Sequence, residues 1–423
     1  MSRFNDVPAW LRWQESLHHQ EIELGLARGR TVLHALQWDT PAFPLISVAG
    51  TNGKGSTVAY LESILLAAGY RVCAHTSPHL LRYNERIRLD GKPIADSLLL
   101  DAFDQVDAAR GDTSLTYFEF ATLAAMAVSR SEAVDVALFE VGLGGRLDAV
   151  NLFDADIAVI TAIGIDHVEY LGGDRESIGR EKAGIMRATK PVIVSDAQPP
   201  DSMAHAADAI GAQPHWLGKD FDYTLDSQRW EWRGAGRRLP DLPRLPMPGE
   251  YQYRNASGAI AALECLALNV PARAVRTGLT GATVAGRFEQ VSEAPDVFLD
   301  VGHNAQATQA MASILDELPS QGRTIAVVGM LENKQHRHAL RALCGRIEQW
   351  CLADVDGPRA SPARTLADAL VSLGDVAPRT SFRSPVEAFR HAQSEAGPSD
   401  RILVFGSFLT VAGVLAELKE RNR

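Results

Sequence analysis

The chain has 423 residues, 46% of them hydrophobic and 22% charged, as in an ordinary soluble globular protein of two or three domains. Its formal net charge of -10, with no block of Lys and Arg, argues against a general nucleic-acid binder. The N-terminus lacks the pattern of a signal peptide, and no apolar run approaches the roughly 18 residues of a membrane span. The four cysteines form no CxxC pair and are expected to be buried free thiols, so we expect a cytoplasmic protein.

The N-terminal residues are expected to be helical. The apolar pattern predicts helix from Val7 to about Leu36. We expect His18 and His19, which fall inside this segment, to be surface or packing residues rather than ligands.

A buried strand, a glycine turn and a helix are predicted next, in the stretch PLISVAGTNGKGST and the residues that follow it. Leu45–Ala49 is apolar enough for a strand buried on both faces, and the helix is expected to end near Ala68, at Gly69. Backbone N–H groups and the helix dipole converge at such a turn, so it predicts a phosphate site, most simply for a nucleoside triphosphate. The predicted phosphate-binding residues are Gly50, Thr51, Asn52, Gly53, Lys54, Gly55, Ser56 and Thr57.

The spacing of this loop departs from the common GxxxxGK[ST] pattern, because Gly55 separates Lys54 from the hydroxyl residues. A chance glycine loop is the alternative interpretation. GTNGKGS resembles the nucleotide loop of the folylpolyglutamate synthase and Mur ligase superfamily, whose members make amide bonds through acyl phosphates.

The next predicted strand, Arg71–Thr76, leads into the polar segment SPHLLRYNERIR, which on residue types alone could be a solvated loop. Ser77 stands where a hydroxyl could join a magnesium shell. TSPHLLRYNERIR resembles a mobile loop beside the family's pterin and nucleotide sites, which implies that Arg82 binds folate. TYFEF then opens a helix whose Phe118 could be core; the resemblance implies that it lines the pterin pocket.

Two further apolar strands, Val134–Val141 and Ile157–Ile163, carry polar residues at their ends. Glu140 ends the first, and Asp166 and His167 follow the second; such strand ends face the ligand crevice of α/β sheets. Ser77, Glu140 and His167 form a plausible Mg²⁺ shell, although histidine is an unusual ligand for this ion, so the assignment depends on resemblance. GLGGRLDAVN between the strands could be a flexible turn, and its resemblance to the family's substrate segment implies that Asp148 and Ala149 bind folate.

Lys182 lies on the predicted helix in GGDRESIGREKAGIMR and could be an ordinary surface lysine. In the family that this segment resembles, the corresponding lysine is carbamylated and binds a second Mg²⁺. Carbamylation requires an uncharged amine, and therefore a lysine with a lowered pKa.

Short antiparallel strands are predicted between about His215 and Pro248, followed by a helix that begins at GEYQYRNA. Its Asn255 resembles the asparagine that approaches adenine in the family. A domain boundary is expected near Val284–Glu293, where GRFE resembles the family hinge whose arginine, here Arg287, reaches the ATP phosphates.

The remaining residues predict a second α/β domain. We expect strands at Val297–Val301 and in TIAVVG, WCLAD and RILVFG, with helices at Ala305–Leu318, His336–Trp350, Leu366–Leu373, Val386–Ala396 and from Phe408. FLDVGHNAQA resembles the family's LDxAHN, which implies that Asp300 and His303 help to hold ATP and glutamate. GMLENK keeps Lys334 but has Asn333 and Gln335 where the family has aspartates.

At least six segments in the right order resemble the dihydrofolate synthase/folylpolyglutamate synthase family. The resemblance implies an α/β fold with a P-loop-type, mostly parallel sheet domain at residues 1–286 and a smaller Rossmann-like domain at residues 287–423. It implies ligation of L-glutamate to dihydropteroate and reduced folates, with Lys54, Lys182 and His303 catalytic. The implied cofactors are ATP, two Mg²⁺ ions and a monovalent cation, and the implied state is a monomer without nucleic-acid or membrane partners.

Two rival functions stay open at this point. A Mur-type ligase acting on a UDP-sugar peptide usually has a separate N-terminal domain, for which a nucleotide strand at about Pro44 begins too early. A non-enzymatic nucleotide switch would not need Glu140, His167 and Lys182 together.

Overall fold

The computed structural model describes residues 2–38, 40–226, 228–318, 321–332, 334–357 and 359–421; Asn333 lies outside this range. The chain forms two compact units. The first comprises residues 1–164, 168–246 and 252–282, and the second comprises residues 165–167, 247–251 and 283–423. Among the described residues, no helix is both long and apolar enough to cross a membrane.

The N-terminal helical segment is two helices rather than one. α1 (Val7–Leu17) is capped by Asp6, whose carboxylate accepts a hydrogen bond from the Ala9 N–H, and α2 (Ala27–Leu36) begins ten residues after α1 ends. The expected continuous helix is wrong because contacts with distant residues hold the intervening segment open. His18 Nδ1 lies 2.9 Å from Ser114 Oγ, and the Gly25 N–H donates to the Leu147 carbonyl.

An eight-stranded sheet forms the centre of the first unit, in the order β4-β3-β2-β5-β1-β6-β7-β8. Its strands are β1 (Leu45–Ala49), β2 (Val72–His75), β3 (Ile87–Leu89), β4 (Lys92–Pro93), β5 (Val136–Glu140), β6 (Ile157–Ile160), β7 (Pro191–Val194) and β8 (Gln213–Trp216). The pairs from β2 to β8 are parallel, and only the β2–β3 and β3–β4 pairs are antiparallel. The expected mostly parallel sheet is therefore confirmed.

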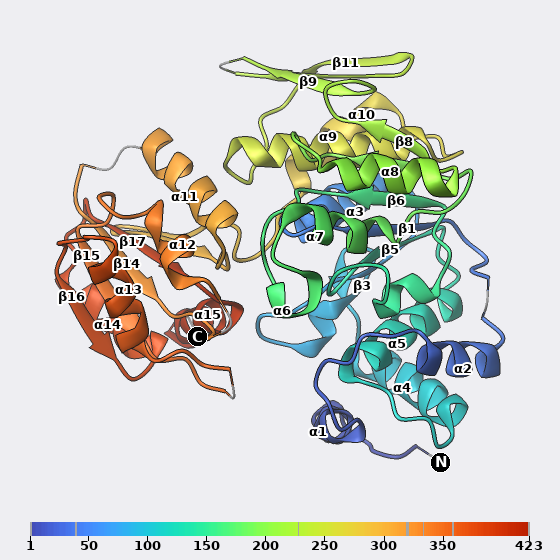
Figure 1. The fold of residues 1–423 in the computed structure, drawn as a ribbon, viewed down its shortest axis with the longest axis horizontal. Helices are drawn as coiled ribbons and strands as arrows, with labels where there is room; N and C mark the ends of the chain where they lie inside the picture. The colour runs from blue at the N-terminus through green and yellow to red at the C-terminus, as the bar shows by residue number, and fades with distance from the viewer. Residues whose placement is uncertain are drawn as a thin grey trace. The chain divides into compact units, whose positions relative to one another are not determined.

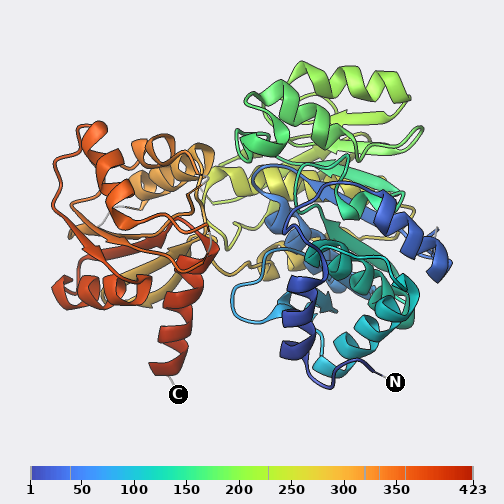
Figure 2. The same cartoon turned by 60° about the horizontal axis from the view of Figure 1, so that its bottom comes forward.

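Helices cover both faces of this sheet, as Figures 1 and 2 show. Leu45, Ala137 and Phe139 share one core with α5, whereas α3 contacts β1, β2 and β5. α3 in turn packs on α10 so closely that a Cβ at Gly278 would overlap the backbone of Ile64. The helices of this unit after α2 are α3 (Lys54–Ala67), α4 (Asp96–Arg110), α5 (Tyr117–Ser131), α6 (Val168–Leu171), α7 (Arg175–Ala183), α8 (Asp201–Ile210), α9 (Glu250–Glu264) and α10 (Ala272–Gly281), with short 3₁₀ turns η1 (Tyr83–Arg86) and η2 (Ala149–Leu152).

A three-stranded antiparallel sheet, β11-β10-β9, belongs to the same unit and matches the expectation for this region. Its strands are β9 (Asp222–Leu225), β10 (Trp230–Gly234) and β11 (Arg237–Leu242). Trp230 and Trp232 of β10 are buried, and the Trp232 indole N–H donates to the Ser257 carbonyl of α9. The aromatic alternation in the sequence is thus the packing face of this small sheet.

The second unit contains a six-stranded sheet in the order β12-β13-β17-β14-β15-β16, parallel except for the β12–β13 pair. Its strands are β12 (Glu289–Glu293), β13 (Asp296–Asp300), β14 (Thr324–Val328), β15 (Gln349–Ala353), β16 (Arg379–Phe382) and β17 (Arg401–Phe405). Its helices are α11 (Ala305–Glu317), α12 (His336–Arg341), α13 (Ala363–Ser372), α14 (Pro385–Glu395) and α15 (Phe408–Arg421). This is the expected α/β arrangement.

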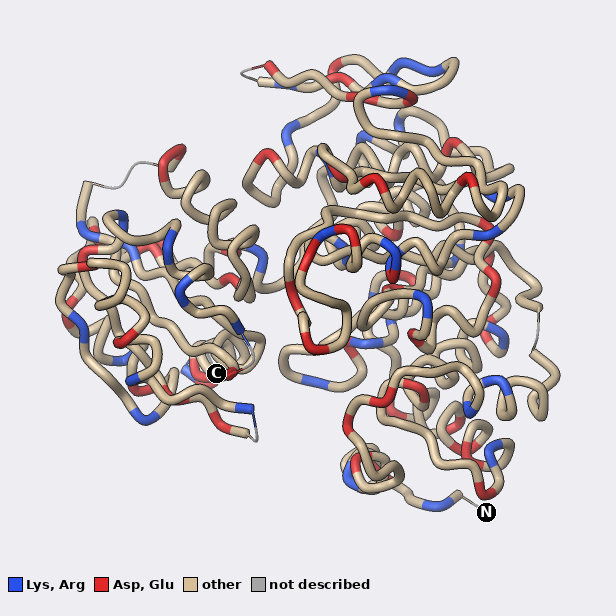
Figure 3. Tube along the Cα trace, in the orientation of Figure 1, with Lys and Arg blue, Asp and Glu red and all other residues tan. Residues whose placement is uncertain are grey.

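Some predictions for individual elements are wrong. The helix expected over His336–Trp350 ends at Arg341, and Gly345 follows with a φ of +79° before β15 begins at Gln349. Of the four cysteines, Cys73 and Cys351 are buried free thiols as expected, but Cys265 and Cys344 are partly exposed. Acidic and basic residues are mixed along both units in Figure 3, in agreement with the absence of a basic block from the sequence.

Candidate active site

The turn between β1 and α3 has the backbone shape of an anion site. Gly53 has a φ of +93°, and a Cβ there would overlap Asn255 Oδ1 of α9. A Cβ at Gly50 would overlap Thr161 Oγ1, and Thr161 donates a hydrogen bond of 2.7 Å to the Asn52 carbonyl. Both positions therefore need glycine, and the turn is fixed against the end of β6 with the N-terminus of α3 directly behind it.

Two lysines converge on one atom of this turn. Lys54 Nζ lies 3.2 Å and Lys182 Nζ 2.9 Å from the Gly50 carbonyl oxygen. Lys182 is buried on α7, so the structure rules out the surface-lysine interpretation. Two ammonium groups on one oxygen repel each other, and Glu140 Oε1 lies 3.9 Å from Lys54 Nζ. An anion here, or conversion of one lysine to an anion, would relieve the repulsion.

Buried hydroxyl groups at the start of α3 provide an independent test of whether a nucleotide and a metal fit. The side chains of Ser56 and Thr57 are buried, and within the described part of the chain neither hydroxyl has a hydrogen-bond partner. A buried unpaired hydroxyl is costly, which is consistent with a ligand that completes it. Hydroxyl and carboxylate oxygens, such as those of Ser56 and Glu140, are ligands that suit a hard cation beside phosphates.

The predicted metal ligands are divided between the two units. Ser77 and Glu140 lie together at the carboxyl ends of β2 and β5, with 3.4 Å between the Ser77 backbone nitrogen and Glu140 Oε2. His167 belongs to the second unit and has a φ of +50°, an uncommon backbone conformation for a histidine. Such positions cluster at functional sites.

Three of the four predicted folate residues surround one loop. The Phe118 ring presses on Gly142 so closely that a Cβ there would lie 2.7 Å from Phe118 Cζ. Asp148 is buried, and its carboxylate accepts hydrogen bonds from the N–H groups of Leu143 and Val150. Burial raises the pKa of Asp148 to about 6, although these N–H groups act in the opposite direction. Ala149 follows it in η2 and is also buried.

Arg82, the fourth predicted folate residue, is mostly exposed and paired with Asp96, with 3.0 Å between Nη2 and Oδ1. Its segment contains η1 and leads into the β3–β4 hairpin. The Glu85 carboxylate accepts hydrogen bonds from three successive N–H groups, those of Leu80, Leu81 and Arg82.

The His75 ring packs against the Phe118 ring, a contact that was not predicted from the sequence. The two ring centroids are 5.7 Å apart at 30°, and His75 Nδ1 lies 3.1 Å from the Arg86 carbonyl oxygen. His75 is fully buried, and this burial, helped by the charges of Arg86 and Arg88, lowers its pKa to about 3.

At acid pH, we expect the His75→Phe variant to lose less free energy of unfolding than the wild type loses. The pKa of His75 in the folded protein lies below the ordinary value of about 6.5, so the unfolded chain binds the extra proton. The stabilisation from neutral His75 is present above pH ~6.5 and is lost as the pH falls toward 3. Unfolding midpoints at pH 7 and pH 5 should show that the wild type loses about 2 kcal/mol more than the variant. The control His205→Phe, at an exposed position, should keep the wild-type dependence, and equal losses in all three proteins would contradict the prediction.

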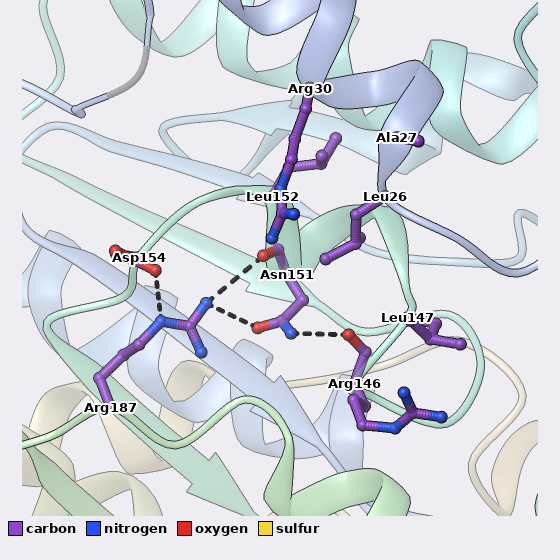
Figure 4. A pocket seen from close by; sticks show the side chains of 9 residues that line it. All are labelled: Leu26, Ala27, Arg30, Arg146, Leu147, Asn151, Leu152, Asp154 and Arg187. Carbon is purple, nitrogen blue, oxygen red and sulfur yellow. Dashed lines mark hydrogen bonds and ion pairs between the residues drawn. The ribbon is translucent and has the colours of Figure 1, made fainter. Parts of the chain in front are cut away.

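A cavity of about 620 Å³ lies between α2 and the loop that carries Asp148 (Figure 4). Asn151, one of its lining residues, makes three hydrogen bonds there. Its Nδ2 donates to the carbonyls of Arg146 and Gly184, and its Oδ1 accepts from Arg187 Nη2 at 2.9 Å. Arg187 also pairs with Asp154, and Arg146 pairs with Glu181. These contacts fix the loop that carries Asp148. The cavity is lined by Leu26, Ala27, Arg30, Arg146, Leu147, Asn151, Leu152, Asp154 and Arg187.

In the second unit, Asp166 is the centre of a charged cluster. Asp166 Oδ1 accepts a hydrogen bond of 2.6 Å from Lys334 Nζ, and Asp166 Oδ2 lies 3.3 Å from His303 Nε2 and 3.2 Å from Asn304 Nδ2. His303 and Lys334 hold the pKa of Asp166 well below its usual range, despite its burial. The role of Asp166 was not predicted from the sequence, in which its place beside His167 in the DH pair was the only signal.

Asp300 and Arg287 lie next to this cluster in the same unit. The Asp300 carboxylate accepts hydrogen bonds from the N–H groups of Phe288 and Gly302, and burial raises its pKa. The Arg287 guanidinium lies over the Phe408 ring, 5.6 Å from its centroid. His303 Nδ1 donates to the Val301 carbonyl at 2.9 Å, which fixes the orientation of the ring.

Comparison with known proteins agrees with this geometry. Residues 48–263 match the family model of the Mur ligase middle domain, and residues 286–408 match that of the Mur ligase glutamate ligase domain. The chain is 43% identical over 418 residues to the dihydrofolate synthase/folylpolyglutamate synthase of Escherichia coli K12, covering 98% of this chain and 96% of that protein.

Solved structures extend the likeness to the whole fold. E. coli FolC in complex with DHPP and ADP has a TM-score of 0.95 and 42% identity over 100% of both chains. A bifunctional folylpolyglutamate synthase/dihydrofolate synthase with Mn, AMPPNP and L-glutamate bound has a TM-score of 0.91 and 42% identity over 99% of both chains. The chain therefore belongs to the dihydrofolate synthase/folylpolyglutamate synthase family of Mur ligases, and it is an ATP-dependent ligase.

Proposed function

We propose that the protein ligates L-glutamate to dihydropteroate, giving dihydrofolate, and to reduced folates, extending their glutamate tails. The observation that carries this proposal is the convergence of Lys54 and Lys182 on the Gly50 carbonyl beside Glu140. Such a site suits the transfer of a phosphoryl group, in which negative charge has to be held in place. The relatives crystallised with ADP and DHPP, or with AMPPNP, Mn and L-glutamate, support this assignment.

The loop supplies the phosphate contacts of bound ATP. Lys54 neutralises charge on the transferred phosphoryl group, and the N–H groups at the start of α3 bind phosphate oxygens. Asn255 is proposed to approach the base, and Arg287 and Asp300 are further proposed ATP-binding residues. The full proposed set is Gly50, Thr51, Asn52, Gly53, Lys54, Gly55, Ser56, Thr57, Asn255, Arg287 and Asp300.

Ser77, Glu140 and His167 are the proposed ligands of one Mg²⁺, and Lys182, once carbamylated, is the proposed ligand of a second. Bound Mg²⁺ supplies charge neutralisation on the phosphates. The buried hydroxyls of Ser56 and Thr57 and the approach of both lysine Nζ atoms to the Gly50 carbonyl support these assignments. A carbamate on Lys182 would replace the second positive charge by a negative one.

In the first step a carboxylate oxygen of the acceptor attacks the γ-phosphorus, and the bond between that phosphorus and the bridging oxygen of ADP breaks. In the second step the α-amine of glutamate attacks the acyl carbon, phosphate leaves and the amine loses a proton. We propose that His303 takes part in this second step, because its contacts with Asp166 and with the Val301 carbonyl fix the orientation of its ring. An acyl phosphate hydrolyses readily, so the reaction requires the exclusion of water.

The acceptor is held by Phe118, Asp148 and Ala149, with Arg82 as a further contact. Phe118 offers a ring face to a flat heterocycle. Asp148, whose pKa of about 6 lies close to neutrality, suits hydrogen bonding to pterin nitrogens. We further propose that residues 1–286 form the ATP and folate domain, that residues 287–423 form the glutamate-ligase domain, and that the protein is a cytoplasmic monomer.

ADP release by the purified protein with Mg²⁺, L-glutamate and one acceptor, either dihydropteroate or tetrahydrofolate, tests the proposal, with products weighed by mass spectrometry. Addition of glutamate to both acceptors would establish both activities. Addition to one alone would remove the other activity. ADP without any adduct, or no ADP at all, would contradict the proposed function.

A further inference from the structure

Three side chains at the end of α1 lie outside the site described above and gather around one carboxylate. His18, His19 and Glu23 place their nitrogen and oxygen atoms within 4.8 Å of one another. His18 Nε2 lies 2.7 Å and His19 Nε2 3.8 Å from the same atom, Glu23 Oε2. The two imidazole rings are 4.4 Å apart between centroids. His18 is buried and His19 is exposed, which agrees with our expectation of a packing residue and a surface residue, but their arrangement around Glu23 was not predicted.

Two of the three groups are already held in position by neighbours. His18 Nδ1 is 2.9 Å from Ser114 Oγ, which leaves Nε2 directed at Glu23. The other oxygen of the carboxylate, Oε1, accepts a hydrogen bond from Arg28, and Arg28 in turn pairs with Glu119 on α5. Ligands whose second polar atom is fixed in this way are typical of metal sites.

The set is also accessible from solvent on one side. The His18 side chain is 4% exposed, Glu23 is 34% exposed and His19 is 71% exposed. A buried histidine, an anchored carboxylate and an exposed histidine give three ligands, with the solvent side free for water. Two imidazoles and one carboxylate with an open fourth position form a common Zn²⁺ donor set, whereas Mg²⁺ prefers oxygen ligands in octahedral geometry.

We propose that His18, His19 and Glu23 form a Zn²⁺-binding site, separate from the Mg²⁺ ligands of the reaction. Tetrahedral Zn²⁺ with bonds of about 2.0–2.2 Å needs ligand atoms about 3.4 Å apart. The observed separations are 2.7 Å between His18 Nε2 and Glu23 Oε2 and 3.8 Å between His19 Nε2 and the same oxygen. The first pair has to open and the second to close, each by less than about 1 Å, and the partly exposed Glu23 and the exposed His19 side chains can supply both movements. The nearby Arg28 charge opposes the ion, so we expect micromolar rather than tighter affinity.

Calorimetric titration of untagged, metal-free protein with Zn²⁺, in millimolar Mg²⁺, tests the site. We expect one Zn²⁺ per chain with a micromolar Kd, and at least tenfold weaker binding by His19→Ala. His205→Ala is the matched control, because His205 is an exposed histidine on α8 of the same unit, and it should bind as the wild type does.

A second variant excludes the other zinc-binding pair that the structure offers in this unit. Cys265 Sγ lies 3.8 Å from His215 Nε2, and a thiol with an imidazole also binds Zn²⁺. Cys265→Ser should leave the titration unchanged. The proposal is overturned if the wild type binds no Zn²⁺, if His19→Ala binds as well as the wild type, or if Cys265→Ser removes the binding. Because His19 is largely exposed, its replacement should not unfold the chain, and the far-ultraviolet circular dichroism of each variant verifies this.

Discussion

Replacing Lys54 by alanine will lower turnover at saturating ATP by at least about 100-fold, the usual effect of removing one group that stabilises transition-state charge. Lys54 Nζ is held by the carbonyls of Gly50 and Thr51, 3.2 and 3.4 Å away, so its charge is fixed over the loop before any ligand binds. An alanine leaves the backbone of the loop intact but removes that charge. Coupled measurement of ADP release with tetrahydrofolate and L-glutamate gives the turnover number directly.

Lys190→Ala is the control for this experiment. Lys190 is an exposed lysine of the same unit, paired with Asp156 at 2.9 Å, and surface ion pairs contribute little. We expect near-normal turnover for this control and unchanged folding for both variants. Near-normal turnover of Lys54→Ala would remove the assignment of the loop to the reacting phosphates.

Replacing Lys182 will have an effect of similar size, for a different reason. Lys182 is buried and donates to the Gly50 carbonyl, so Lys182→Ala removes both a loop contact and the proposed carbamate. We expect turnover to fall by about 100-fold or more. Lys182→Arg should not restore it, because a guanidinium stays charged and cannot capture CO₂. A variant that regains activity with arginine would show that only a positive charge is needed at this position.

Carbon-13 spectra separate the carbamate from a purely structural role. Wild-type protein equilibrated with ¹³C-bicarbonate should show a carbamate resonance that is absent from Lys182→Ala and retained in Lys190→Ala. A short carboxylic acid added to Lys182→Ala should restore part of the turnover, because it can occupy the space of the lost carbamate. No resonance in the active wild type would eliminate the carbamate and leave Lys182 as a loop-positioning residue.

Much of the fold was predictable because buried parallel strands are encoded locally. β1, β2, β5, β6 and β7 each read as short apolar runs, since both faces of such strands are covered. The nucleotide loop could likewise be predicted from its glycines, because the backbone at Gly53 adopts a conformation that residues with a side chain rarely adopt. The antiparallel β3–β4 hairpin and the edge strand β16 were not predicted, because short, partly exposed strands carry little apolar pattern.

The sequence by itself therefore determined the sheet domains, the phosphate loop and the family, all of which depend on contiguous residues. Which distant residues these segments contact was decided only by the tertiary structure. Lys182 reaches Gly50 across 132 positions of the chain, and Asp166 meets Asn304 across 138. The same holds for His75 behind Phe118, and for the segment between α1 and α2, which Ser114 and Leu147 hold out of the helix that its own pattern favours. Local propensity is a weak preference that such distant hydrogen bonds and packing override, so these contacts could not be read from any one stretch of sequence.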